Sequence, residues 1–141
     1  MGSRSWFGAA IAAGAMLAAA GSAQATWSII LVDMRTGEVA VGCATCLAGF
    51  DLKEGTPVLL TGVGAASAQS FVDVTFQNRT FIRDRMAEGV APATIITQLA
   101  AFDGSHQTRQ YGIADVLGRS ATFSGTGAGQ WRGGQAGSYE Y

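Results

Sequence analysis

The sequence predicts an α+β domain in which strands and helices occupy separate stretches of the chain. Runs of β-branched and aromatic residues favour strands near both ends of residues 26–124, and apolar residues recur at helical spacing between them. The 141 residues include 20 glycines and only 2 prolines, and many glycines fall where turns are expected. The predicted order is β-β-β-α-α-β-β, which favours segregated sheets and helices over an alternating parallel fold.

Residues 1–25 have the pattern of a secretory signal. One positive charge, Arg4, precedes an apolar stretch over residues 6–20, and the segment ends in an A-x-A pattern at Ala25. The apolar stretch is shorter than the roughly 20 residues of a membrane-spanning helix, which argues against an uncleaved anchor. We therefore expect cleavage that leaves Thr26 first, and export to the periplasm or the medium with no membrane attachment afterwards.

Residues 26–141 are expected to form one small domain of nearly neutral charge. They carry eight basic and ten acidic side chains, a formal net charge of −2. The clustered basic residues around Arg83 alternate with acidic ones on a predicted helix, which is typical of a solvated face. We therefore expect no nucleic-acid partner, and the sequence leaves a homo-oligomer open.

The first two predicted strands, residues 26–33 and 38–45, form a hairpin. The four residues between them end on Gly37, which favours a tight turn. Because side chains alternate between the faces of a strand, this turn brings a polar cluster to one face at the open end of the hairpin. The cluster consists of Thr26 opposite Thr45 and Ser28 opposite Cys43. A slip of one residue in the register would remove it.

A loop, a third strand and a helix are expected next. Residues 47–57 have mixed charge and no periodic pattern, whereas residues 58–66 are mostly apolar and predict a buried strand. Ser70 is expected to cap a helix over residues 71–88. Asp73 would then lie in the first turn, near the positive end of the helix.

A second helix and a final hairpin complete the predicted elements. Pro92 fits the first turn of a helix with an apolar stripe, and Gly104 would end it. Residues 111–115 and 119–124 favour two strands joined by a short turn. Residues 125–141 contain almost only glycine, small polar residues and aromatics, and no regular element is predicted there.

Thr26 has the groups needed for nucleophilic catalysis if it begins the mature chain. A hydroxyl alone is a poor nucleophile, but an α-amino group has a pKa of about 7.7–8.0 and can accept the hydroxyl proton. A terminal threonine therefore contains its own general base. The alternative is that Thr26 stands there by chance, because many exported chains begin with a small residue.

The remaining reactive side chains give weaker indications. Cys43 and Cys46 form C-x-x-C on a predicted strand, where the two side chains would point to opposite faces. Oxidation after export leaves open a local disulfide or pairing with cysteines elsewhere. His106 lies in a polar loop and is expected on the solvated surface, and Gly125–Gly129 lacks the Lys-Ser/Thr ending of a phosphate loop. We expect no metal and no cofactor.

Seven segments, taken in order, resemble blocks of the bacterial family named domain of unknown function 1028. Each is short, but the ordered set covers the chain from Thr26 to about Trp131. The segments are residues 26–30, 36–45, 62–69, 88–92, 109–115, 118–119 and 123–125.

That family is similar to the N-terminal nucleophile (Ntn) hydrolases. The resemblance implies a four-layer αββα sandwich and makes Thr26 the leading catalytic candidate. Oxyanion or supporting roles fall to Thr45, Ser67 and Gln69, for which bonding to strand-end backbone is the alternative. The sequence departs from the family in its two cysteines, and we expect it to stop short of the family's C-terminal strands and helix.

Two main functions follow as expectations. The first is an exported Ntn-type amidohydrolase that acts on a small-molecule amide or a peptide. The second is an exported binding or structural domain of the same fold without catalysis, since fold alone does not fix function. A truncated, unstable fragment is a third alternative.

Overall fold

The computed structural model describes residues 26–130 and 132–140, and the predicted signal over residues 1–25 lies outside them. The described part is a mixed α+β structure with two antiparallel sheets and three α-helices, which confirms the predicted class. The elements are β1 (Thr26–Val32), β2 (Val39–Thr45), α2 (Leu52–Gly55), β3 (Pro57–Leu60), β4 (Gly64–Gln69), α3 (Gln77–Ala87), α4 (Pro92–Phe102), a 3-10 turn (His106–Thr108), β5 (Gln110–Asp115) and β6 (Ser120–Ser124).

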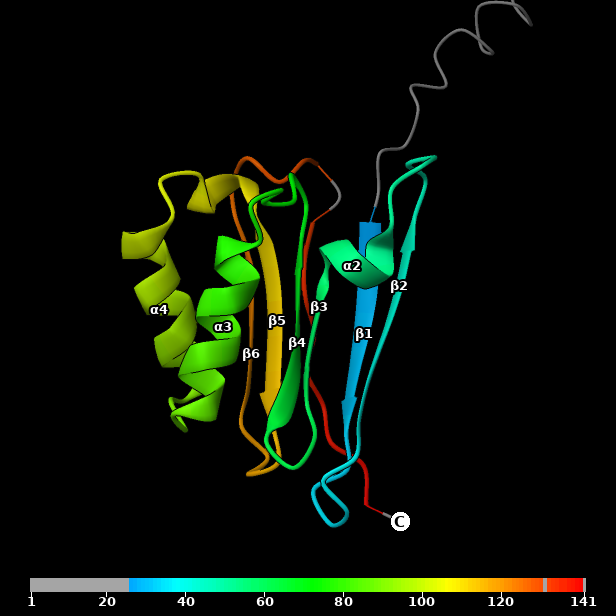
Figure 1. Cartoon of the computed structure of the whole chain (residues 1–141), viewed down its shortest axis with the longest axis vertical. Coiled ribbons are helices and arrows are strands. Elements are labelled where there is room, and N and C mark those ends of the chain that lie inside the picture. The colour runs from blue at the N-terminus through cyan, green and yellow to red at the C-terminus, as the bar shows by residue number, and fades with distance from the viewer. Residues whose placement is uncertain (1–25, 131, 141) are drawn as a thin grey trace, which may run out of the picture.

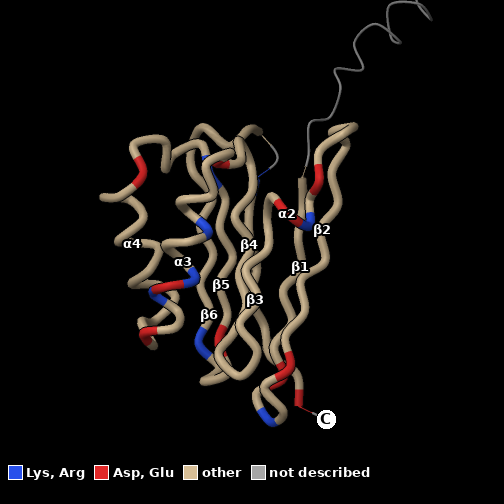
Figure 2. Tube along the Cα trace, in the orientation of Figure 1, with Lys and Arg blue, Asp and Glu red and all other residues tan. Residues whose placement is uncertain are grey.

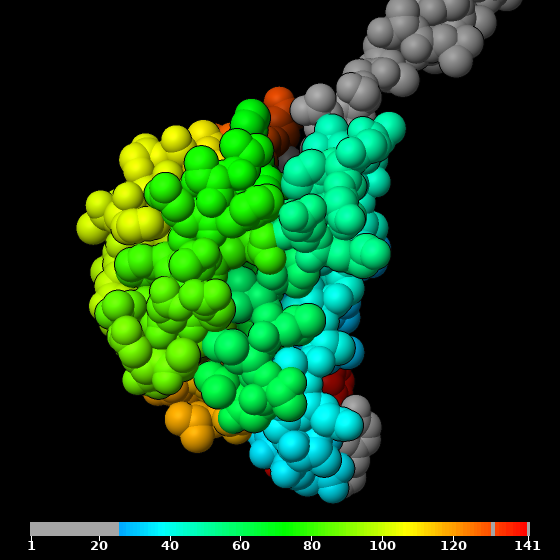
Figure 3. Space-filling view, viewed as in Figure 1, coloured from blue at the N-terminus to red at the C-terminus, as the bar shows by residue number. Residues whose placement is uncertain are grey.

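The elements pack in three layers (Figure 1). Helices α3 and α4 cover one face of a four-stranded sheet with the order β3-β4-β5-β6, and the β1–β2 hairpin packs on its other face. The space-filling view places the side chains of the helices and of the hairpin on opposite sides of the molecule (Figure 3). The main core lies between the helices and the four-stranded sheet, around Ile82, Ile95, Leu99 and Ile113. Burial of each such side chain contributes about 1.5–3 kcal/mol.

The predicted register of the first hairpin is confirmed. Thr26 pairs with Thr45 and Ser28 pairs with Cys43. The side chains of this set are partly buried against the four-stranded sheet. The alternate side chains of β1 form an apolar outer face in which Trp27, Ile29 and Leu31 are 60%, 52% and 58% exposed.

The prediction of a single strand over residues 58–66 is wrong. The segment is a hairpin in which β3 and β4 pair antiparallel around a turn at residues 61–63. Gly62 has φ +76°, and the Val63 N–H donates to the Leu60 carbonyl, which closes the turn. The apolar run therefore folds back on itself. The loop expected over residues 47–57 also contains the one-turn helix α2, capped by Asp51.

The start of the first long helix was also predicted wrongly. Ser70 does not cap it, because Ser70 and Phe71 adopt left-handed conformations with φ of +58° and +38°. The carboxylate of Asp73 instead accepts hydrogen bonds from the N–H groups of Thr75 and Asn78, which shapes the turn before α3. The other boundaries follow the prediction, with Pro92 in the first turn of α4.

His106 contradicts the expectation of a solvated surface residue. Its side chain is buried, and its ring stacks on Phe123 with centroids 4.0 Å apart. Burial lowers the pKa of His106 from its ordinary value, and the neighbouring Asp103 opposes that shift only in part. The imidazole therefore extends from the 3-10 turn and packs against β6.

This burial makes stability depend on pH. Below the ordinary histidine pKa of about 6.5, the unfolded chain takes up a proton that the buried ring resists, so stability falls as the pH falls. Urea denaturation between pH 5 and 7.5 should show this loss, and the variant His106→Gln should reduce it. An identical pH dependence in the variant would contradict the assignment.

Candidate functional site

Thr26 and Thr45 form a hydroxyl pair where β1 begins and β2 ends. Their Oγ1 atoms lie 2.9 Å apart, and either can be the donor. The Thr45 hydroxyl also accepts a hydrogen bond from the Leu47 N–H at 3.2 Å. Both threonines are partly buried. Antiparallel pairing thus holds the candidate nucleophile against a second hydroxyl, as the sequence predicted for these two positions.

Gln69 connects this pair to the four-stranded sheet. Its Nε2 donates to the Thr26 carbonyl oxygen at 3.0 Å. Because a carbonyl oxygen only accepts hydrogen bonds, this contact fixes which end of the amide faces Thr26. The other end, Oε1, is buried without a hydrogen-bond partner. Thr26, Thr45 and Gln69 are therefore joined in one small constellation.

Ser67 lies on the same strand but is not joined to that constellation by a hydrogen bond. It precedes Gln69 by two residues, so both side chains lie on the face of β4 toward the β1–β2 hairpin. Ser67 is completely buried, and its hydroxyl has no partner. Unpartnered buried hydroxyls are uncommon and costly, and Ser67 is not among the residues that line the cavity described below.

Thr56 is a neighbour of the site that the sequence did not reveal. The hydroxyl of this fully buried residue donates to the Leu52 carbonyl at 2.8 Å. The Cys43 thiol lies 3.1 Å from Thr56 Oγ1. Because the Thr56 proton is already used, the thiol is the donor in this second contact. Cys43 and Cys46 are not joined to each other, so the local disulfide left open by the sequence is absent. The partly buried Cys43 thiol acts here as a structural donor.

A largely buried ion pair supports the segment that follows Gln69. Arg109 Nε donates to Asp103 at 2.8 Å, and another nitrogen of the same guanidinium donates to the Phe71 carbonyl. Asn78 donates to the same carboxylate at 2.8 Å. Burial raises the pKa of Asp103, but the hydrogen bonds from Arg109 and Asn78 outweigh it and lower the value to about 2. The left-handed backbone after Gln69 is thereby held in place.

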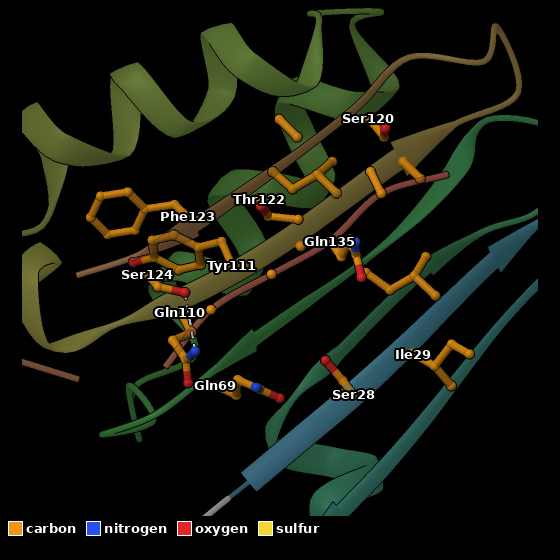
Figure 4. A pocket seen from close by; sticks show the side chains of 18 of the residues that line it. Ser28, Ile29, Gln69, Gln110, Tyr111, Ser120, Thr122, Phe123, Ser124 and Gln135 are labelled. Atoms are coloured by element: carbon orange, nitrogen blue, oxygen red, sulfur yellow. Dashed lines mark hydrogen bonds between the residues drawn. The ribbon is translucent and has the colours of Figure 1, made fainter. Parts of the chain in front are cut away.

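A cavity of about 230 Å³ opens beside β1 (Figure 4). Ser28 of β1, Gln69 of β4 and Gln110 of β5 line it, and Gln110 donates to Ser124 of β6 at 3.1 Å. Figure 4 shows Gln69 and Gln110 close together, with Ser28 across from them. The cavity therefore has a polar end at the side of the molecule where Thr26 lies.

Positive and negative side chains are mixed, and the described residues hold no cluster of metal ligands. Lys and Arg residues are interspersed with Asp and Glu along the chain (Figure 2). Within residues 26–130 and 132–140, no three His, Cys, Asp or Glu side chains are grouped to hold a metal ion. No helix in the same ranges has the length and apolar character needed to cross a membrane.

The fold and site define a layered α+β protein with a polar constellation where the first strand begins. The chain belongs to a family of unknown function, DUF1028, whose sequence model matches residues 26–140. It is similar to the crystal structure of protein SPO2555 from Silicibacter pomeroyi, assigned to the same family, with a TM-score of 0.62 and 23% identity. The match covers 72% of this chain and 45% of that one, so this chain spans less than half of that protein. No curated protein matches the chain.

The ion pair of Arg109 and Asp103 gives a testable prediction. Arg109→Met would leave the Asp103 carboxylate without its cation, which should lower the free energy of unfolding by about 3 kcal/mol at pH 7. The advantage of the native pair is present above the ordinary aspartate pKa of about 3.8 and is lost as the pH falls toward 2. The cost of the variant should therefore shrink in acid.

The matched control is Arg35→Met, since Arg35 forms an exposed pair with Asp33 and should change stability very little. Equal effects of the two substitutions in urea denaturation would refute a special role for Arg109.

Proposed function

We propose that this protein is an exported Ntn-type amidohydrolase with Thr26 as its nucleophile. The observation that carries the proposal is the 2.9 Å contact between the hydroxyls of Thr26 and Thr45, at the start of the first strand. Gln69 supports the same residue through its carbonyl. In this proposal, cleavage after Ala25 frees the Thr26 amine, so export and activation are one event.

The Thr26 amine is the proposed general base. A free α-amino group titrates near 7.7–8.0, so a substantial fraction is neutral at physiological pH. It lies on the same residue as the hydroxyl, which keeps base and nucleophile together without a histidine. The buried His106 stacks within the helix-side core and has no part in the mechanism.

The reaction proceeds through an acyl-enzyme. Thr26 Oγ1 attacks the amide carbonyl carbon while its proton passes to the α-amine. The tetrahedral intermediate then breaks its C–N bond, and the leaving amine takes that proton. An ester on Thr26 remains. A water molecule attacks the ester, gives one proton to the α-amine, and releases the acid as Thr26 Oγ1 recovers a proton.

Thr45 and Gln69 support this chemistry in different ways. Because Thr45 Oγ1 already accepts from Leu47, its own proton is available for Thr26 Oγ1 or for the oxyanion. A single donor to the oxyanion can lower a barrier by about 3–4 kcal/mol. Gln69 is a positioning residue, since it holds the Thr26 backbone rather than the hydroxyl. Ser67 is proposed as a further donor to the oxyanion.

The layer order supports an Ntn-like sandwich as part of this proposal. Helices, a four-stranded sheet and a second sheet correspond to three of the four layers in αββα. The apolar outer face of Trp27, Ile29 and Leu31 is where a fourth layer would pack. The longer relative has enough additional chain to supply one.

The test uses an electrophilic acyl probe and intact-mass measurement. The secreted protein should begin at Thr26 by N-terminal sequencing and should gain one acyl group. Thr26→Ala should abolish labelling, because no nucleophile remains, whereas Thr26→Ser should retain it. Thr36→Ala, which removes an exposed turn hydroxyl, is the control and should label normally. Equal labelling of the native protein and Thr26→Ala would refute the proposal.

A further inference from the structure

One edge of β1 has no strand beside it in the described part of the chain. β1 pairs only with β2 in a two-stranded sheet. The Asp33 N–H donates to the Glu38 carbonyl, which makes that pair a hydrogen-bonded one. Because such pairs alternate along an antiparallel ladder, the backbone groups of Ser28 and Ile30 point away from β2. They face the cavity beside β1, whose lining includes both residues.

The floor of this cavity is made of small side chains. The faces of β5 and β6 toward the hairpin present Gly112, Ala114, Ser120 and Thr122. A Cβ atom at Gly112 would lie 2.9 Å from Ile30 Cδ1, so β1 packs directly on β5 at that point. The cavity volume, about 230 Å³, is below the usual range of about 300–1,000 Å³ for drug-sized ligands. The site therefore suits an occupant with little side-chain volume facing the floor.

A residue at the polar end of the cavity has an unused acceptor that is closed off from solvent. Gln69 is nine-tenths buried and lines the cavity, and its Oε1 has no hydrogen-bond partner. Its Nε2 is already committed to the Thr26 carbonyl. An occupant that donates an N–H to Oε1 would remove the cost of this unsatisfied group. A backbone amide is such a donor.

The C-terminal segment shows that polypeptide packs on this floor. Residues 133–137 line the cavity. A Cβ atom at Gly134 would lie 2.7 Å from the Thr122 Cβ, so the backbone of this segment is in direct contact with β6. Figure 4 shows Gln135 of the same segment between β5 and β1. The cavity is thus a slot, called here the β1 slot, between the free edge of β1 and residues 133–137.

We propose that the β1 slot binds an extended peptide as an added strand along the free edge of β1. Its backbone pairs with Ser28 and Ile30, and one of its N–H groups donates to Gln69 Oε1. Side chains that face the floor are small, and the alternate ones are aliphatic because they continue the outer face beside Ile29. A peptide bound this way runs toward the Thr26 hydroxyl. Calling the peptide a substrate rests on the proposed hydrolase function, whereas its binding does not.

The experiment measures binding without turnover. Purified protein carrying Thr26→Ala is titrated against acetyl-Ala-Val-Ala-Val-Ala-Val with a C-terminal fluorescein, and anisotropy should rise to saturation. Adding Ser28→Pro removes a backbone N–H that faces the slot and leaves the hydrogen bonds between β1 and β2 in place, so the fold should persist and Kd should rise at least about tenfold. Adding Ser28→Ala instead keeps that N–H, so its loss of affinity should be much smaller than that of Ser28→Pro.

A second arm does not depend on any substitution at Ser28. The same peptide with N-methyl groups on alternate amides cannot donate to the strand edge, and it should also bind at least about tenfold more weakly. Absence of saturable binding, or equal binding of the methylated and unmethylated peptides, would overturn the proposal. Binding that persists while the native protein resists acyl labelling would reject the hydrolase and retain the slot.

Discussion

The hydrogen bond from Gln69 to the Thr26 carbonyl is the contact on which the site depends. It joins the two sheets where β1 begins, and it comes from a side chain that is itself almost fully buried. On the other side, the Thr45 hydroxyl contacts Thr26 Oγ1. The backbone of Thr26 is thus held by β4 and its hydroxyl by β2. A nucleophile needs this kind of preorganisation, because misplacement by about 1 Å can reduce a rate about a hundredfold.

The sequence could predict what depends on local pattern. The α+β class, the register that places Thr26 opposite Thr45, and the second helix from Pro92 were all accessible, because turn length and side-chain alternation determine them. Gln69 was a candidate through the family resemblance alone. Its contact with Thr26 spans 43 residues of sequence, and no local pattern specifies such a contact.

The errors have a common physical origin in tertiary packing. The apolar run after Pro57 became a hairpin because Gly62 permits a tight turn, and only its second half, β4, is fully buried. The sequence predicts Ser70 as a helix cap, but the structure has it in a left-handed conformation. Arg109 holds the next residue through the Phe71 carbonyl. His106 sits in a polar stretch, yet it is buried by a ring contact with Phe123 across the fold. The local propensity of the sequence for helix, strand or turn is overridden by such contacts, and their partners are distant in sequence.

The central claim is that Thr26 acts only when its own amine is free. The most direct measurement compares two forms of the chain, one beginning at Thr26 and one with Ala25 retained before it, in reaction with an electrophilic acyl probe followed by intact mass. Our account predicts rapid acylation of the first form and little or none of the second, because an amide nitrogen cannot serve as the base. Equal acylation of both forms would contradict it.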